Sequence, residues 1–114
     1  MSYDVDLMYE ENIAKVPPHS EGGTYSPGNT DASLNITYNY HMFFEEHLGD
    51  RGIYSLQGKR ADQTICQLEK AVDALGSFAP DEDYWKPTAG NAKKALLILL
   101  EWAKLHPTAI WDVS

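Results

Sequence analysis

The sequence predicts a small α+β domain in which two or three short antiparallel strands pack against about three helices. The 114 residues, 43% of them apolar, are enough for one hydrophobic core and too few for two. Residues 34–41 alternate between apolar and polar side chains, which is typical of a strand. Residues 61–75 and 88–105 repeat apolar side chains at helical spacing. We therefore expect residues 1–114 to form a single domain.

The strand predicted over residues 34–41 has one apolar and one polar face. The apolar set is Leu34, Ile36, Tyr38 and Tyr40, and the polar set is Asn35, Thr37, Asn39 and His41. Because a strand buries one face, the polar face is free to hold a small polar ligand or the backbone of a partner. Residues 3–9 alternate in the same way and are expected to pair with this strand, while residues 108–113 form a closing edge strand.

Residues 16–33 are predicted to form a long, flexible loop without regular structure. They contain Pro17-Pro18, Gly22-Gly23 and Pro27-Gly28-Asn29, all of which favour turns. Loops longer than about 12–15 residues in a compact domain are often functional or disordered. The contents of this loop assign no role on their own.

Two helices are expected in the middle of the chain, each with a recognisable end. The first covers residues 42–48, with Asn39 as a candidate cap at its start and Gly49 as its stop. The second covers residues 61–75, where an apolar stripe faces the core and charged residues lie on the solvent-exposed face. Gly76 ends this second helix.

The third helix is the most apolar segment of the chain. It begins at Thr88, a hydroxyl N-cap, and ends where His106-Pro107 cannot continue it. Its middle is apolar nearly all round, which favours a central place in the core. Leu97 lies opposite the main apolar stripe, so homodimer packing is the alternative.

The net charge of −8 lies entirely in the first half of the chain. Residues 1–50 hold nine Asp/Glu and one Lys, whereas residues 51–114 hold eight acidic and eight basic residues. An acidic surface repels phosphate backbones, so direct nucleic-acid binding is disfavoured. A basic protein surface is a more suitable partner.

A cytoplasmic location is expected. The longest apolar run, residues 95–100, is far shorter than the roughly 20 residues needed to span a bilayer, so no membrane association is predicted. The first residues are acidic where a secretory signal would be basic and then apolar. The single cysteine, Cys66, excludes an internal disulfide and is most simply a small core residue.

Four potential metal ligands or catalytic groups fall within seven residues, namely His41, Glu45, Glu46 and His47. Their spacing differs from the His-Glu-x-x-His pattern of zinc peptidases, and a further protein ligand would have to come from elsewhere. We therefore expect a solvated helix face and predict no metal and no cofactor. No serine has the Gly-x-Ser-x-Gly context of a nucleophile. No catalytic residue is assigned, and an enzyme is the less favoured interpretation.

The segment before the last helix is predicted to form a pocket with the polar strand face. A helix N-terminus offers free N–H groups and the positive end of the helix dipole, which suits an anion or a carbonyl group. The alternative is an ordinary helix start with Trp85 packed on the core. The predicted ligand-binding residues are Asn35, Thr37, Asn39, His41, Trp85 and Asn91.

A resemblance adds context to this pattern. Its features lie between residues 34 and 111 and are Asn35-Ile36-Thr37-Tyr38-Asn39, Met42, Gly52-Ile53, Leu56-x-Gly58, Leu75-Gly76, Trp85, Gly90 and His106-Pro107. With them the chain resembles a group of small uncharacterised bacteriophage and prophage proteins that carry an Asn-x-Thr-(His/Tyr)-Asn motif. The resemblance implies action inside a bacterial host cell and brings no reaction with it.

Three functions follow in order of preference. The first is a non-enzymatic, phage-type binding protein that holds a small polar ligand or a host protein and counteracts a host defence. The second is an acidic inhibitor that mimics nucleic acid on a basic host protein, with an affinity that falls steeply with salt. The third is a small hydrolase that uses His41 with Glu45 or Glu46.

Overall fold

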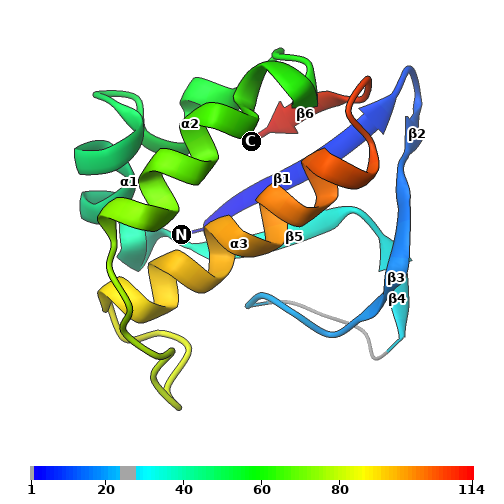
Figure 1. The fold of residues 1–114 in the computed structure, drawn as a ribbon. Coiled ribbons are helices and arrows are strands. Elements are labelled where there is room, and N and C mark those ends of the chain that lie inside the picture. Colours follow the sequence, from blue (N-terminus) through cyan, green and yellow to red (C-terminus); the bar gives the residue numbers. More distant parts are fainter. Residues whose placement is uncertain (1, 24–27) are drawn as a thin grey trace.

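The computed structural model describes residues 2–23 and 28–114, in which three α-helices cover one face of an antiparallel sheet (Figure 1). The strands are β1 (Ser2–Tyr9), β2 (Asn12–Ile13), β3 (Lys15–His19), β4 (Asn29–Asp31), β5 (Ser33–Thr37) and β6 (Ile110–Val113). The helices are α1 (His41–Leu48), α2 (Ala61–Ala74) and α3 (Ala89–Leu105), with 3₁₀ turns η1 (Tyr38–Tyr40) and η2 (Gly52–Leu56). The α+β class and the number of α-helices are confirmed, whereas the strands outnumber the two or three expected.

Strand β1 lies at the centre of the main sheet, between β5 and β6. It is antiparallel to both, so that Val5 stands opposite Leu34 on one side and Val113 on the other. Val5 is fully buried beneath the helices, whereas Asp4 and Asp6 alternate with it and lie on the open face of the sheet. The predicted pairing of the first strand with the strand that starts near residue 34 is therefore confirmed.

Strand β5 ends at Thr37, whereas the alternation predicted a strand as far as His41. The Thr37 hydroxyl accepts a hydrogen bond from the Asn39 N–H (3.2 Å) and so caps η1, which leads directly into α1. This local bond satisfies the backbone in competition with a longer strand. Asn39 and His41 are therefore not strand residues, and α1 begins without the side-chain cap expected from Asn39. Gly49 ends α1, as predicted.

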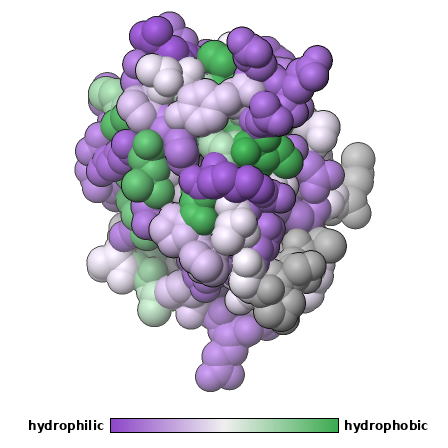
Figure 2. Space-filling model, turned by 90° about the vertical axis from the view of Figure 1, so that its right-hand side faces the viewer, coloured by the Kyte–Doolittle hydropathy of each residue, from purple (hydrophilic) through white to green (hydrophobic). Residues whose placement is uncertain are grey.

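Strands β3 and β4 form a second, two-stranded sheet where the sequence predicted an irregular loop. Lys15 stands opposite Asp31 and His19 opposite Asn29, with an irregularity between the two pairs. Two prolines are tolerated in β3 because an edge strand can leave backbone positions unpaired. Figure 2 shows the side of the molecule that carries this ribbon, where hydrophilic residues prevail around small, separate hydrophobic patches. Residues 24–27 of the predicted loop lie outside the described residues.

Helix α3 crosses the sheet beside α2 and has the central place in the core that the sequence predicted (Figure 1). It starts after Thr88, whose hydroxyl accepts a hydrogen bond from the Asn91 N–H (3.1 Å), and it ends at Leu105. Leu97 is exposed on its outer side, so homodimer packing there stays a prediction. Within residues 2–23 and 28–114, no helix is long and apolar enough to cross a membrane.

Helix α2 and strand β6 meet in the core. Trp111 of β6 is fully buried, and its indole N–H donates a hydrogen bond to the Thr64 hydroxyl of α2 (2.9 Å). Thr64 and Leu68 lie on the buried side of the helix. Cys66 lies two residues from each and therefore points the opposite way. The prediction of Cys66 as a core residue is wrong, because its side chain is exposed.

Candidate functional site

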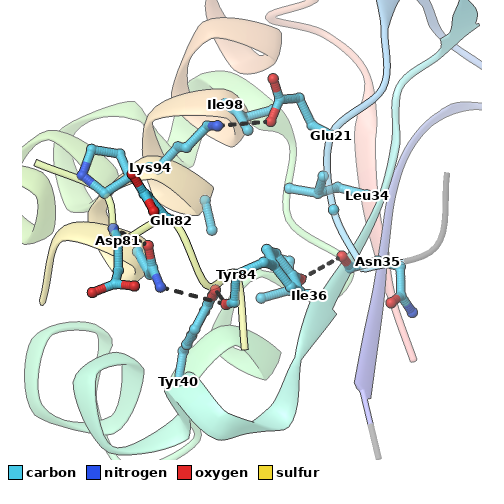
Figure 3. Close-up of a pocket in the computed structure, with 14 residues that line it drawn as sticks. Glu21, Leu34, Asn35, Ile36, Tyr40, Asp81, Glu82, Tyr84, Lys94 and Ile98 are labelled. Carbon is cyan, nitrogen blue, oxygen red and sulfur yellow. Dashed lines mark hydrogen bonds and ion pairs between the residues drawn. The ribbon is translucent and has the colours of Figure 1, made fainter. Parts of the chain in front are cut away.

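A cavity of about 140 Å³ lies between β5 and the first half of α3 (Figure 3). Its sides are closed by Glu21 and Gly22, which follow β3, and by Pro80, Asp81, Glu82 and Tyr84, which precede α3. The apolar part of the wall is formed by Leu34, Ile36, Ala95 and Ile98 and by the rings of Tyr40 and Tyr84. Concave, largely apolar sites of this kind are where small molecules usually bind to proteins.

Tyr84 closes the outer edge of β5. Its hydroxyl donates a hydrogen bond to the Asn35 carbonyl oxygen (3.0 Å; Figure 3) and accepts one from the Thr37 N–H (2.9 Å). The Tyr40 hydroxyl in turn donates to the Tyr84 carbonyl oxygen. Burial raises the pKa of both phenols, so both stay neutral at physiological pH. The half-buried Tyr84 side chain thus satisfies backbone groups of β5 that a neighbouring strand would otherwise pair.

Asn91 holds the loop of residues 81–86 on the start of α3. Its amide nitrogen donates hydrogen bonds to the Asp83 and Lys86 carbonyl oxygens, both at 2.9 Å. Its amide oxygen accepts a hydrogen bond from the Asp81 N–H (2.8 Å). Only 5% of the residue is exposed. Asn91 therefore lines the cavity with its hydrogen-bonding capacity already used by the protein.

Two glycines, one in the cavity wall and one near it at the start of α3, let backbone segments approach each other closely. Gly22 has φ +94°, and a Cβ there would lie 2.6 Å from the Asn35 carbonyl oxygen. Its neighbour Gly23 donates its N–H to the same oxygen (2.9 Å). At Gly90 on α3, a Cβ would lie 2.0 Å from the Ala79 carbonyl oxygen. Neither approach leaves room for a larger residue.

The mouth of the cavity is charged. Glu21 and Lys94 form an ion pair of 3.1 Å that joins the 20–23 segment to α3 (Figure 3). Asp81 pairs with Lys86 at 3.5 Å, and Glu82 is exposed beside it. A hydrogen bond from the Asp83 N–H, aided by Lys86, holds the pKa of the Asp81 carboxyl below its usual range. The Asp81 carboxyl is therefore ionised at neutral pH.

Of the six residues predicted to bind a ligand, Asn35 and Asn91 line the cavity. The Asn35 side chain, however, turns to the open face of the sheet, where its amide nitrogen donates to the Ser2 hydroxyl and the Asp4 carboxylate, both at 2.9 Å. It therefore contributes backbone rather than a free amide to the cavity. The structure does bring strand β5 and the start of α3 together, but through the apolar face of the strand, with Leu34 and Ile36, and not through the polar face that the sequence predicted.

The other four predicted residues lie outside the cavity lining. Thr37 caps η1, and the Asn39 amide donates a hydrogen bond to the Trp85 carbonyl oxygen (2.8 Å). The Trp85 side chain is 51% exposed, so it is not packed into the core. His41 stacks on Tyr38 with ring centroids 4.6 Å apart. These residues fasten the 84–85 segment and the start of α1.

Sequence reasoning missed the residues that shape the cavity most, namely Tyr40, Tyr84, Glu21 and Lys94. Tyr84 stands next to the singled-out Trp85, but its hydroxyl partners lie 47 and 49 residues away along the chain. No local pattern marks such contacts. For Lys94, the one available signal was its place one turn after Asn91 on the predicted helix.

The cluster of His41, Glu45, Glu46 and His47 does not converge. His47 and Glu46 approach to 3.9 Å, whereas the His41 ring bonds the Tyr38 carbonyl oxygen. Across the part of the chain that the structure describes, no three His, Cys, Asp or Glu residues gather as metal ligands would. The geometry gives no support to a hydrolytic centre at this helix.

The chain matches no family model, no curated protein and no solved structure. Its function therefore has to be argued from the geometry of the cavity and the charges around it.

Proposed function

We propose that this is a non-enzymatic binding protein and that its ligand site is the cavity between β5 and α3. The observation that carries the proposal is a concave space of about 140 Å³ whose walls are held in place by internal hydrogen bonds. Preformed, mostly apolar cavities with a few polar groups at the mouth favour ligand binding because little ordering is needed on association. The proposed setting is the cytoplasm of a bacterial host, as the phage-type resemblance implies.

The hydrogen bonds of the wall favour binding over catalysis. The Tyr40 and Tyr84 hydroxyls and the Asn91 amide are each engaged with the protein's own backbone. A catalytic acid, base or nucleophile needs a free reactive atom within reach of substrate. For the same reason the ligand body should be apolar, with polar groups confined to the mouth, in contrast to the small polar ligand expected from the sequence.

The proposal is tested by filling the cavity. The measurement is a ¹H–¹⁵N chemical-shift titration with benzyl alcohol, a neutral probe of about the right size. Shifts should cluster at residues 34–36 and 91–98. Ala95→Leu, which places three carbons in the cavity, should abolish them, and Ile98→Phe is a second filling variant at a half-buried position.

The matched control is Ala74→Leu, the same substitution at an exposed position of α2. It should leave the titration unchanged. Shifts that fall elsewhere, or that persist in both filling variants while their spectra stay well dispersed, would rule out the cavity as the ligand site. Absence of any shift at millimolar probe would do the same.

A second candidate function, an acidic inhibitor of a basic host protein, is favoured by the open face of the main sheet. Asp4, Asp6 and Asp112 lie there, and β1, β2, β5 and β6 contain no Lys or Arg. Asp6 and Asp112 stand directly opposite each other, an arrangement that costs stability unless a cation compensates it. A basic partner would supply that cation.

Anisotropy of a labelled arginine-rich octapeptide tests this second function. Affinity should fall steeply between 50 mM and 300 mM salt. The triple variant Asp4→Asn, Asp6→Asn, Asp112→Asn should lose most of the binding. The control removes three exposed charges from the helical side, at Glu69, Asp73 and Glu101. Equal losses in both variants would mean that net charge alone acts, and the sheet face would then have no special role.

A further inference from the structure

The mouth of the cavity carries more negative than positive charge. Among its lining residues are three carboxylates, Glu21, Asp81 and Glu82, and one ammonium group, Lys94. Lys94 is already paired with Glu21, and Lys86, which pairs with Asp81, stands outside the lining. Glu82 is exposed, and no ion pair involves it in the described part of the chain. A ligand therefore enters past an uncompensated carboxylate.

At the start of α3, the N–H groups of Asn91 are not free to attract an anion despite this negative charge. The sequence predicted an anion or carbonyl pocket there because a helix N-terminus has free N–H groups. In the structure Thr88 accepts the Asn91 N–H, and Gly90 lies against the Ala79 carbonyl. The Asn91 amide faces carbonyl oxygens of residues 83 and 86. An anion in the cavity would find these N–H groups already hydrogen-bonded within the protein, and it would be repelled by the nearby carboxylates.

The inner part of the cavity limits the size of the ligand. Its volume is about 140 Å³, and an apolar cavity of about 150 Å³ binds one benzene molecule. Ile36 and Ala95 offer methyl and methylene groups, and the polar wall atoms are engaged internally. A single ring, or an aliphatic body of similar volume, fills this space.

We infer that the cavity takes a small monoammonium compound, with a benzene-sized apolar body beside Ile36 and Ala95 and its ammonium group at the mouth near Glu82. This inference rests on the proposed function, since it names the ligand class of the same site. Two features carry it together: the apolar, hydrogen-bond-saturated interior and the excess of carboxylates at the entrance.

Three probes of equal size and different charge test the inference: benzylamine, benzyl alcohol and benzoate. Each is titrated into the protein at neutral pH and low salt, and the shifts of cavity amides give the dissociation constants. Benzylamine should bind about threefold more tightly than benzyl alcohol, the gain expected of one partly exposed ion pair, and benzoate should bind most weakly. Raising the salt to 0.5 M should narrow these differences.

Glu82→Gln should remove most of the preference for benzylamine while leaving benzyl alcohol affinity unchanged. The matched control is Glu101→Gln, an exposed carboxylate farther along α3 and outside the cavity lining, which should leave the preference intact. Equal effects of both variants would overturn the claim that charge at the mouth selects the ligand.

The remaining outcomes separate this inference from the proposed function. If benzoate or benzyl alcohol binds as tightly as benzylamine at the cavity amides, the ammonium class is wrong and the cavity remains a ligand site. If none of the three probes shifts those amides, the proposed function itself fails.

Discussion

The two outer edges of the main sheet are closed in different ways. At β6, backbone of residues 57–60 runs alongside, with the Gly58 N–H bonded to the Trp111 carbonyl and the Trp111 N–H bonded to the Lys59 carbonyl, both at 3.0 Å. At β5, the Gly23 N–H and the Tyr84 hydroxyl form the hydrogen bonds to the edge backbone instead. At the β6 edge the indole of Trp111 is fully buried in the core, whereas the β5 edge borders a cavity of about 140 Å³.

The two edges differ in how tightly the space beside them is filled. A strand-like neighbour brings its own side chains into the core and leaves little space. At β5 the Tyr84 hydroxyl and the Gly23 N–H satisfy edge groups without a neighbouring strand, and a cavity lined by Ile36 remains beside them. We therefore expect substitutions at the β6 edge to act mainly on unfolding, and those at the β5 edge to act also on the cavity.

Trp111→Ala is expected to have the largest effect, since it removes a fully buried indole and its hydrogen bond to Thr64. The free energy of unfolding should fall by about 3–5 kcal/mol in urea denaturation. Trp85→Ala is the matched control, because Trp85 is 51% exposed and its removal should cost much less stability. Equal losses at the two tryptophans would contradict the larger contribution that burial assigns to Trp111.

Gly90→Ala is expected to destabilise by about 1–3 kcal/mol, because the new Cβ has no room beside the Ala79 carbonyl oxygen at 2.0 Å. The same substitution inside a helix normally stabilises by up to about 1 kcal/mol. Urea denaturation therefore tests the prediction by the sign of the change in the free energy of unfolding. A stabilised variant would mean that residues 78–80 do not press against α3.

Tyr84→Phe should cost about 1–2 kcal/mol, because it leaves the buried Thr37 N–H without an acceptor. Hydrogen exchange should show a specific loss of protection at the Thr37 amide, with the β6 amides unchanged. Tyr54→Phe, at a tyrosine that is 39% exposed, is the control and should change neither quantity. Uniform loss of protection across both edges would argue against a local role for the Tyr84 hydroxyl.

Asp6→Asn should have the smallest effect, a gain of about 0.5 kcal/mol or less at pH 7. Burial raises the pKa of the Asp6 carboxyl, aided by Asp112 and Asp4 and opposed by the Ser33 hydroxyl. The folded state thus holds this proton more tightly than the unfolded state, so its contribution is full in acid and is lost as the pH rises through the raised pKa. Asparagine cannot ionise, so the substitution avoids the loss of stability that Asp6 causes at neutral pH. The expected gain in stability is small because the Asp6 side chain is partly exposed to solvent.

Thermal unfolding of Asp6→Asn and the parent protein at several pH values checks this prediction. The variant should be more stable at neutral pH, and the difference should shrink below the usual pKa range of aspartate. Asp73→Asn on the exposed side of α2 is the control for removing one carboxylate elsewhere on the surface. A variant that loses stability at pH 7 would show that the charged form of Asp6 is favoured by its contacts.

Much of the fold could be predicted because the decisive contacts are local. Gly49 ends α1, and Thr88 caps α3 through a hydrogen bond to the third residue after it. The alternation of β1 likewise places Val5 inside and Asp4 outside within a few residues of chain. Periodicity and caps of this kind act over one or two turns, so a single sequence reveals them.

Less of the candidate site could be predicted, because it depends on contacts between distant segments. The alternation of residues 34–41 continued past Thr37, and only the competition between a capped turn and a strand ended β5 there. Asn91 was singled out near the start of α3 as a free amide, whereas backbone partners in residues 81–86 occupy it. Neither outcome has a signature in local composition.

The sequence by itself therefore determined the α+β class, the helix limits and the central place of α3, since short-range periodicity and capping set them. Only the tertiary structure decided how the β5 edge is closed and that a cavity stands beside it. Tyr84 reaches Thr37 across 47 residues, and Glu21 reaches Lys94 from another part of the fold. Such contacts depend on how whole elements pack, which no window of neighbouring residues contains.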